Sequence, residues 1–234
     1  MLRTHQSDVA VTRDVRFSNF FGTLAWNVTE GLFSSHNLMP VLIGGAGALA
    51  VYPVDMEISD HLIGEAAAVG HAGHAIGHPM TTVASVLTSV VAAQYTQNRR
   101  FRGFAYTLAQ AQILDSTLKY VLKGSISRTR PSGENDNSFP SGHTSTTLTL
   151  ATVAASYYGY RVAIPAYAAA AFVGLSRLER GKHFPSDIVF GATLGYIAGR
   201  TAIRGTERSL LPEGVTIAPV VSPDRAGLLG SWKF

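Results

Sequence analysis

Three clusters of charged, hydroxyl and imidazole residues lie between apolar segments in the second half of the chain. Their sequences are KGSISRTRP at 123–131, PSGH at 140–143 and SRLERGKHFPSD at 176–187. Polar residues this dense need partners if they are buried between apolar segments. We therefore expect the clusters to lie at helix ends and to converge on one mouth of a helical bundle.

Apolar segments of helical character flank the clusters. We expect helices over 81–95, 104–124, 142–159, 162–177 and 186–201. The segment 38–54 is also apolar, but two prolines and a pair of glycines within it predict a poor straight helix. Residues 125–140 are rich in turn formers and predict a loop through which a substrate could enter. The predicted fold is all-α, a compact helical bundle with its active site at one mouth.

The two ends of the chain have a different character from this core. We predict one domain over 1–234, with an N-terminal extension to about residue 35 and a C-terminal tail from about residue 205. The first residues, MLRTHQSDVAVTRDVRF, carry charges where an export signal would need an unbroken apolar run. In the tail, the turn-rich SPDRA separates two short apolar runs, which is typical of a β-hairpin. An extended tail is the alternative, because Pro219 weakens the first strand.

The composition sets limits on the class of protein. The chain has 234 residues, of which 46% are hydrophobic and 15% charged, and this length suits one core better than two domains. The formal charge of +4 is mild, and the basic residues do not form a patch interleaved with aromatic residues, so nucleic acid is not an expected partner. The absence of cysteine excludes disulfides and thiol chemistry.

The residue types in the three clusters suit a phosphate site. A phosphoryl group in its transition state spreads negative charge over its oxygens, and fixed cations can stabilise that charge. Lys123, Arg130 and Arg177 can supply such cations. Ser141 and Gly142 stand where a loop is predicted to become a helix, so their backbone N–H groups can face an anion.

Two histidines complete the predicted site. One imidazole can attack phosphorus and the other can protonate the departing oxygen, since histidine titrates near neutral pH. If Pro185 occupies the first turn of a helix, Asp187 lies one turn beyond His183 and could hold that imidazole in the attacking tautomer. We therefore predict His183 as the nucleophile and His143 as the acid.

The order K-x6-RP, PSGH and SR-x5-H-x3-D resembles the signature of the type 2 phosphatidic acid phosphatase and vanadium haloperoxidase superfamily. Every signature position is matched between Lys123 and Asp187. The resemblance implies an all-helical core, metal-independent hydrolysis of phosphomonoesters and a covalent phosphohistidine at His183. In the haloperoxidase branch, the same pocket holds vanadate instead.

We accordingly predict a phosphatase, related to acid and phosphatidate phosphatases, that acts on a phosphomonoester or on a lipid phosphate or diphosphate. No cofactor is expected, and vanadate should act as an inhibitor. One alternative is a vanadium-dependent haloperoxidase with vanadate as its cofactor, and another is a pocket that binds an anion without turnover. The second alternative needs arginines and backbone donors, but not two histidines with a carboxylate.

The sequence leaves a choice between a soluble and a membrane-embedded bundle. A spanning helix needs about twenty mostly apolar residues, whereas the predicted segments are shorter and the mean hydropathy is only +0.16. These features favour a soluble bundle in the cell envelope, periplasmic or exported. The alternative is an integral membrane lipid phosphatase with the same chemistry, to which the family resemblance points.

One further pattern lies outside the clusters. His71, His74 and His78 stand at i, i+3 and i+7 and would share one face of a helix. Imidazoles at this spacing suit zinc or copper, but no neighbouring carboxylate or cysteine completes a ligand set, and no metal is predicted. Alternatively, these histidines form a polar seam between helices or lie near the entrance to the active site.

Overall fold

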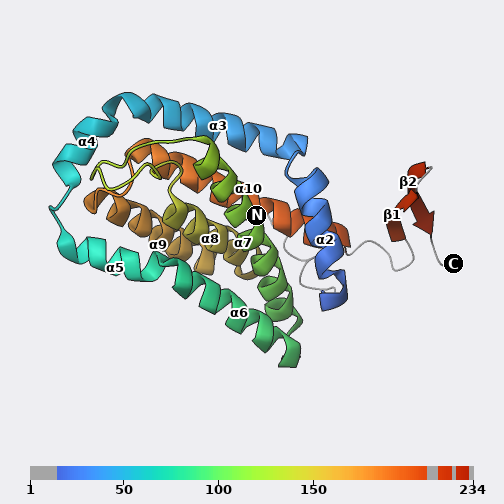
Figure 1. Ribbon diagram of the computed structural model, residues 1–234. Helices are drawn as coiled ribbons and strands as arrows, with labels where there is room; N and C mark the ends of the chain where they lie inside the picture. The colour runs from blue at the N-terminus through green and yellow to red at the C-terminus, as the bar shows by residue number, and fades with distance from the viewer. Residues whose placement is uncertain (1–14, 210–215, 223–224, 232–234) are drawn as a thin grey trace, which may run out of the picture.

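The computed structural model describes residues 15–209, 216–222 and 225–231. The start of the chain, on which the interpretation of the export signal depends, lies outside these residues up to position 14. In chain order the helical elements are η1 (Phe17–Asn19), α2 (Phe20–Trp26), η2 (Asn27–Gly31), α3 (Ser35–Val51), η3 (Tyr52–Val54), α4 (Asp55–Leu62), α5 (Ala67–Gly77), α6 (Pro79–Tyr95), α7 (Arg99–Ser125), α8 (Gly142–Tyr158), α9 (Tyr160–Glu179) and α10 (Pro185–Ser209). The predicted all-α bundle is confirmed (Figure 1).

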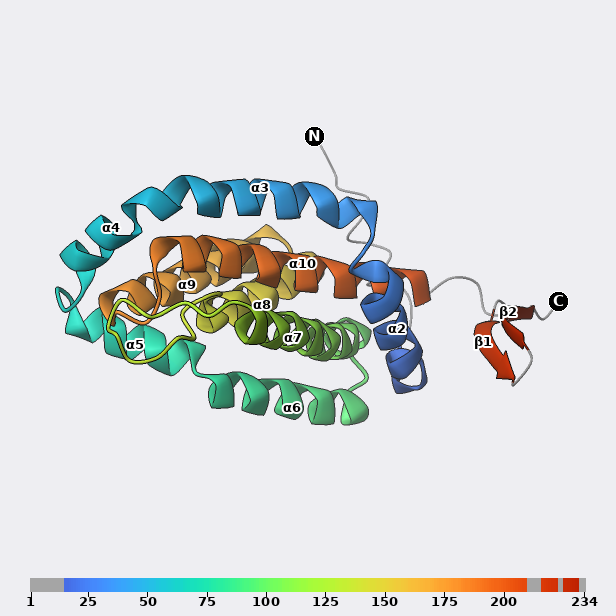
Figure 2. The same ribbon diagram turned by 45° about the horizontal axis from the view of Figure 1, so that its top comes forward.

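The centre of the bundle is formed by α7, α8 and α10, with α9 packed on α8 (Figures 1 and 2). On the outside, α3 packs on α10, α5 on α9 and α6 on α7. Small residues allow close approach at the centre, since a Cβ atom at Gly195 of α10 would lie only 2.2 Å from the carbonyl oxygen of Ser145 in α8. The core beside this contact contains the buried residues Leu108, Ala111, Leu114, Val153, Tyr157, Ala198 and Ala202.

The prediction of a poor helix over 38–54 is wrong at Pro40, through which α3 continues, and is confirmed at Pro53, where α3 has given way to the 3-10 helix η3. Pro40 removes one backbone hydrogen bond of the helix. Of the glycine pair, Gly44 serves packing: a Cβ atom there would lie 1.9 Å from Oγ1 of Thr193 in α10. The absence of a side chain at Gly44 therefore lets α3 lie directly on α10.

The outer helices turn apolar side chains away from the protein. Within the described residues, three segments are long and apolar enough to cross a membrane: Ser35–Leu62, Ala67–Tyr95 and Tyr160–Glu179. The most apolar windows of the first two are only 17% and 6% buried, and side chains such as Ile43, Leu49 and Leu87 are more than half exposed. Apolar surface on this scale requires lipid around it.

The chain is therefore an integral membrane protein, and the preference for a soluble bundle is wrong. Two of the spanning segments join consecutive helices, α3 with α4 and α5 with α6, so each is longer than the sequence indicated. The mean hydropathy is low because polar residues such as Thr107, Asp115 and Thr149 are packed inside the bundle. They do not face the lipid.

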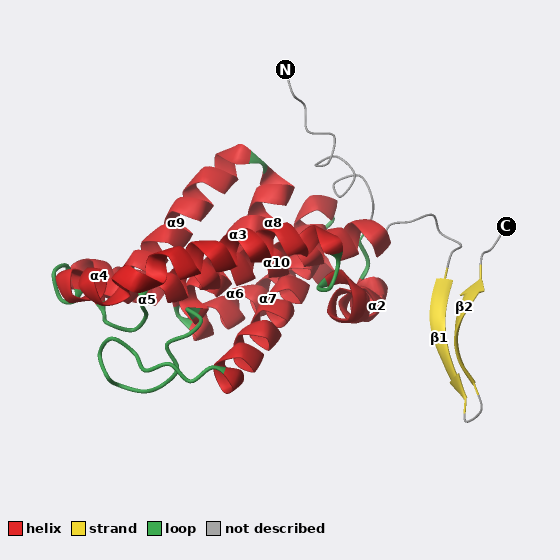
Figure 3. Ribbon diagram, turned by 90° about the horizontal axis from the view of Figure 1, so that it is seen from above, coloured by secondary structure: helices red, strands yellow, loops and turns green. Residues whose placement is uncertain are grey.

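The end of the chain forms two antiparallel strands, β1 (Thr216–Ser222) and β2 (Arg225–Ser231), coloured yellow in Figure 3. Thr216 pairs with Ser231 and Ser222 with Arg225, so the two strands are paired over their whole described length. Of the two alternatives for the tail, the structure has the hairpin.

Candidate active site

The three clusters lie at one end of the bundle, where α7 and α9 end and α8 and α10 begin. The connection between α7 and α8 runs across this end, near α4 and α5 (Figure 2). This connection forms hydrogen bonds with the first and the third cluster. The carbonyl of Asn137 accepts from Lys123, and Ser138 contacts His183 and Asp187. The sequence placed eight residues at the site, namely Lys123, Arg130, Ser141, Gly142, His143, Arg177, His183 and Asp187, and all of them lie at this end.

His183 is buried, with 3% of its surface exposed. Its Nδ1 lies 2.5 Å from the carbonyl oxygen of Ser138, and a carbonyl can only accept, so Nδ1 carries the proton. Burial lowers the pKa of His183 well below its usual range, and the charges of Lys123 and Arg177 lower it further. The ring is therefore neutral, with the lone pair on Nε2.

Asp187 does not hold the His183 ring in the way that the sequence suggested. Its carboxylate accepts from Ser138 Oγ at 2.5 Å, from Phe184 N at 2.8 Å and from Arg128 at 2.5 Å. The reason is its place in the first turn of α10, where a carboxylate can reach back to the N–H of the residue that precedes the helix. Asp187 is thus connected to His183 through Ser138, whose hydroxyl donates to Asp187 and whose carbonyl contacts the His183 ring.

The start of α8 presents backbone donors, but not all of those expected. Ser141 N–H donates to the carbonyl oxygen of Asp187 at 3.0 Å and is therefore not available to an anion, contrary to the prediction. This bond joins the starts of α8 and α10. Within the described residues, the N–H groups of Gly142 and His143 have no hydrogen bond, as is usual in the first turn of a helix. These two N–H groups can therefore donate hydrogen bonds to an anion.

The cations and the second histidine leave several polar atoms unpaired. The Nε atoms of Arg130 and Arg177 and Nε2 of His143 are buried, and none has a hydrogen-bond partner among the described residues. The pKa of Lys123 is lowered to about 8 by burial and by the charge of Arg130. Buried polar atoms are normally paired, so these groups indicate a site made for an anion.

A carboxylate from the connecting loop pairs with Arg130 and with a further cation, Lys182. Glu134 accepts from Lys182 and lies 3.5 Å from Arg130 Nη1. Its hydrogen bond with Lys182 is the main cause of its lowered pKa. The loop therefore places a carboxylate beside Arg130, at the edge of the candidate site.

Sequence reasoning missed Arg128 and Asp55. Arg128 lies between two carboxylates, with Asp55 at 2.6 Å and Asp187 at 2.5 Å. Its guanidinium also lies over the ring of Phe184, 4.3 Å from the centroid. Asp55 accepts from the backbone N–H of Ser186 at 2.9 Å. The sequence indicated Arg128 only by its place inside the first cluster, where an arginine is usually a solvated surface residue. No sequence pattern indicated Asp55.

Replacing Asp55 by alanine should destabilise the protein by about 3 kcal/mol, because it removes one partner of a buried ion pair and leaves the Ser186 N–H unsatisfied. The measurement is unfolding in detergent micelles, followed by circular dichroism. Asp60→Ala is the matched control, since Asp60 is exposed on the same helix. Equal stability of the two variants would contradict the proposed role of Asp55.

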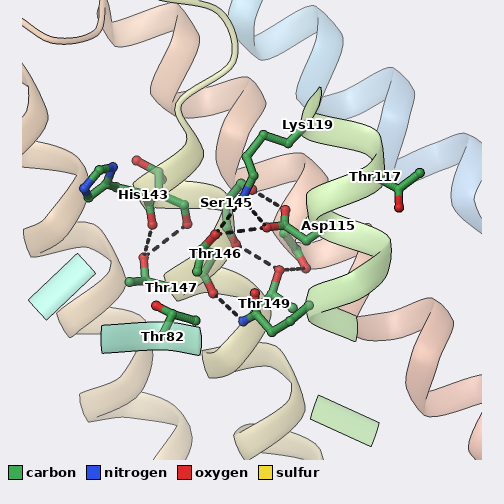
Figure 4. Close-up of polar contacts among 12 residues, drawn as sticks. Thr82, Asp115, Thr117, Lys119, His143, Ser145, Thr146, Thr147 and Thr149 are labelled. Atoms are coloured by element: carbon green, nitrogen blue, oxygen red, sulfur yellow. Dashed lines mark hydrogen bonds and ion pairs between the residues drawn. The ribbon is translucent and has the colours of Figure 1, made fainter. Parts of the chain in front are cut away.

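A second missed network supports the start of α8 (Figure 4). Asp115 is fully buried on α7 and pairs with Lys119 Nζ at 3.1 Å. Thr146 of α8 joins them, accepting from Lys119 at 2.9 Å and donating to Asp115 at 3.0 Å. The Lys119 stem packs where a Cβ atom of residue 142 would stand, at 3.0 Å, which favours glycine there. In Figure 4, His143 points away from this network.

The histidines of α5 do not form a metal site in this structure. Among the described residues, no group of three or more metal-ligating side chains is placed to hold an ion. His74 Nδ1 instead lies 3.2 Å from Arg177 Nη1, and its ring centroid lies 5.5 Å from that of His143. Of the alternatives for these histidines, the polar seam between helices is supported for His74, which contacts α9, whereas His71 is exposed.

Comparison with known proteins finds relatives of this chain among lipid phosphatases. Over 80 residues the chain is 40% identical to a lipid A 1-phosphatase of Porphyromonas gingivalis, which covers 33% of this chain and 18% of that protein. Over 133 residues it is 32% identical to a lipid A 1-phosphatase of Rhizobium etli, covering 48% of this chain and 56% of that protein. The chain thus spans only part of the length of these curated relatives.

A solved structure shares the fold. It is a transmembrane PAP2 type phosphatidylglycerolphosphate phosphatase from Bacillus subtilis, with a TM-score of 0.63 and 22% sequence identity over 74% of this chain and 96% of that one. The model of the PAP2 superfamily matches residues 80–210, more than half of the sequence. The resemblance that the three clusters indicated is therefore confirmed, and this chain belongs to the PAP2 superfamily.

Proposed function

We propose that this protein is a metal-independent phosphatase that removes the terminal phosphate of a lipid phosphate or diphosphate through a phosphohistidine on His183. The observation that carries the proposal is the state of His183. Its Nδ1–H is held by Ser138, its Nε2 keeps a lone pair, and the charges of Lys123, Arg177 and Arg130 act on the same ring. A neutral nucleophile among cations suits attack on an anionic phosphoryl group.

The reaction follows from these positions in two steps. Nε2 of His183 forms a bond to phosphorus while the bond from phosphorus to the lipid oxygen breaks, and that oxygen takes a proton from His143. Water then attacks phosphorus and breaks the bond to nitrogen, and His143 takes the proton of the water. In both steps the negative charge on the phosphoryl oxygens is stabilised by Lys123, Arg130, Arg177 and the N–H groups at the start of α8.

A lipid substrate is supported by the surroundings of the site. The outer helices carry apolar side chains into the bilayer, and the site lies at the end of the same bundle, where a headgroup at the membrane surface could reach it. The curated relatives act on lipid A by name, and the structural neighbour on phosphatidylglycerolphosphate. Within this class, the relatives favour a membrane lipid over a soluble phosphomonoester.

A substrate panel tests this proposal. Phosphate release from an aryl phosphate, phosphatidic acid, a polyprenyl diphosphate and lipid A should be measured in detergent micelles without added metal. The lipids should be preferred over the aryl phosphate. Bromide oxidation supported by vanadate, measured on the same preparation, tests the haloperoxidase alternative. Phosphate binding without turnover of any substrate would support an inert anion site instead.

Activity should survive chelation. Three cationic side chains supply the positive charge that a metal ion would otherwise provide, so EDTA should change the rate of phosphate release by less than about twofold. The measurement compares the rate before and after dialysis against EDTA. Loss of activity that zinc or magnesium restores would contradict the prediction and would point back to the histidines of α5.

A further inference from the structure

Helix α5 carries a row of glycines, Gly70, Gly73 and Gly77, and beside it a row of histidines, His71 and His74, which His78 continues just beyond the end of the helix. The glycine row lies directly on α9, since a Cβ atom at Gly73 would stand 2.3 Å from the Cβ of Ser176. At Gly77 it would stand 2.6 Å from Val173 and 3.2 Å from the ring of His143. Only the absence of side chains lets α5 approach α9 so closely. This approach brings the histidine row to the edge of the phosphate site.

His74 is the member of that row that contacts the site. The distance between its Nδ1 and Arg177 Nη1 is 3.2 Å. Arginine can only donate, so Nδ1 is the acceptor and a neutral His74 carries its proton on Nε2. The His74 ring also lies beside that of His143, with 5.5 Å between centroids and 30° between planes.

Arg177 contacts a neutral imidazole, whereas Arg128 contacts two carboxylates. Arg128 lies between two buried carboxylates, which cancel its charge and make it a structural residue. Within the part of the chain that the structure describes, Arg177 has no ion pair, and its side-chain contact is the imidazole of His74. A neutral acceptor can orient a guanidinium without cancelling the positive charge that a phosphoryl group needs.

We propose that His74 is a positioning residue of the active site, which orients Arg177 toward the phosphate while leaving its charge intact. The inference rests on the proposed function. It adds a residue from a helix that precedes the matched family region, which begins at residue 80. It also explains why an imidazole, and not a carboxylate, stands at this position.

Three substitutions at residue 74 separate orientation from charge. In His74→Asn the amide oxygen can take the place of Nδ1 as a neutral acceptor. In His74→Leu the volume is kept but the acceptor is lost, and in His74→Asp the acceptor carries a negative charge. His71→Leu is the matched control, because His71 is exposed one turn away on the same helix. The measurements are KM and kcat for phosphatidic acid and competitive inhibition by inorganic phosphate.

His74→Leu should raise KM and the inhibition constant of phosphate about tenfold, as expected for the loss of one hydrogen bond to a charged group. His74→Asn should restore both constants to within about twofold of the unmodified protein. His74→Asp should weaken phosphate binding as much as His74→Leu does, although it keeps an acceptor, because its charge pairs with Arg177. The His71→Leu control should change neither constant.

Other results would overturn the proposal. If His74→Asn is as defective as His74→Leu, or if His74→Asp behaves like His74→Asn, then orientation without charge cancellation is not the role of this residue. If His74→Leu does not fold, the comparison of the asparagine and aspartate variants still decides. If no variant hydrolyses a lipid phosphate, the proposed function fails, and protection from thermal unfolding by inorganic phosphate tests His74 separately.

Discussion

Replacing His183 by alanine is expected to abolish phosphate release from every substrate, by about 10⁴-fold or more, together with the covalent intermediate. His183 is neutral, its Nδ1–H is bound by the Ser138 carbonyl, and it lies near Lys123, Arg130 and Arg177. Within the described residues, no other histidine combines these three features. The loss should not depend on the leaving group, because the bond from Nε2 to phosphorus forms in the first step. His61→Ala, an exposed histidine on α4, is the control and should retain full activity.

The intermediate itself can be measured. A phosphohistidine is labile to acid and stable to base, so phosphate trapped on the quenched protein reports it directly. The unmodified protein and the His61→Ala control should both trap phosphate, and His183→Ala should trap none. If His183→Ala traps phosphate while His143→Ala does not, the roles of the two histidines are reversed.

The second large effect is expected at His143, and it should depend on the leaving group. A lipid alkoxide leaves only with a proton, so His143→Ala should slow hydrolysis of phosphatidic acid by about 10²- to 10⁴-fold. Nitrophenolate leaves largely unaided, so the loss with nitrophenyl phosphate should be much smaller. The two kcat values, measured on one preparation of each protein, give the ratio that tests the prediction.

The electrostatics of His143 explain how it becomes an acid. Burial and the charge of Arg177 lower its pKa to about 3, so alone the ring is neutral near pH 7. The negative charge of a phosphoryl group acts in the opposite direction and raises the pKa, so that the proton is bound together with the substrate. Equal losses with both substrates would mean that His143 contributes binding and no proton.

Sequence patterns were sufficient for α8 and α9 and for the meeting of the three clusters. The spacing of apolar residues placed α8 and α9 to within two residues of their observed bounds. The clusters fall at helix ends, so the fold brings them together at one end of the bundle. Both results follow from local periodicity and from the need to pair buried polar groups.

Contacts between segments distant in sequence could not be predicted in this way. Nothing local indicates that Ser138, and not Asp187, contacts His183, or that Ser141 N–H donates to the carbonyl of Asp187. Asp55 lies 131 residues before its partner Ser186. The prediction of a soluble bundle was wrong for a related reason. A mean hydropathy cannot distinguish polar residues packed inside the bundle from polar residues that face outward.

The pairing of Arg128 with Asp55 bears on how the protein can be recombined with its relatives. A chimera that kept residues 80–234 and took its first helices from another member of the superfamily would separate Arg128 from Asp55 and α9 from the glycines of α5. The incoming helices would have to place a carboxylate opposite Arg128 and a row of glycines against α9. For this chain, a segment exchanged with these two contacts intact has to begin before Asp55.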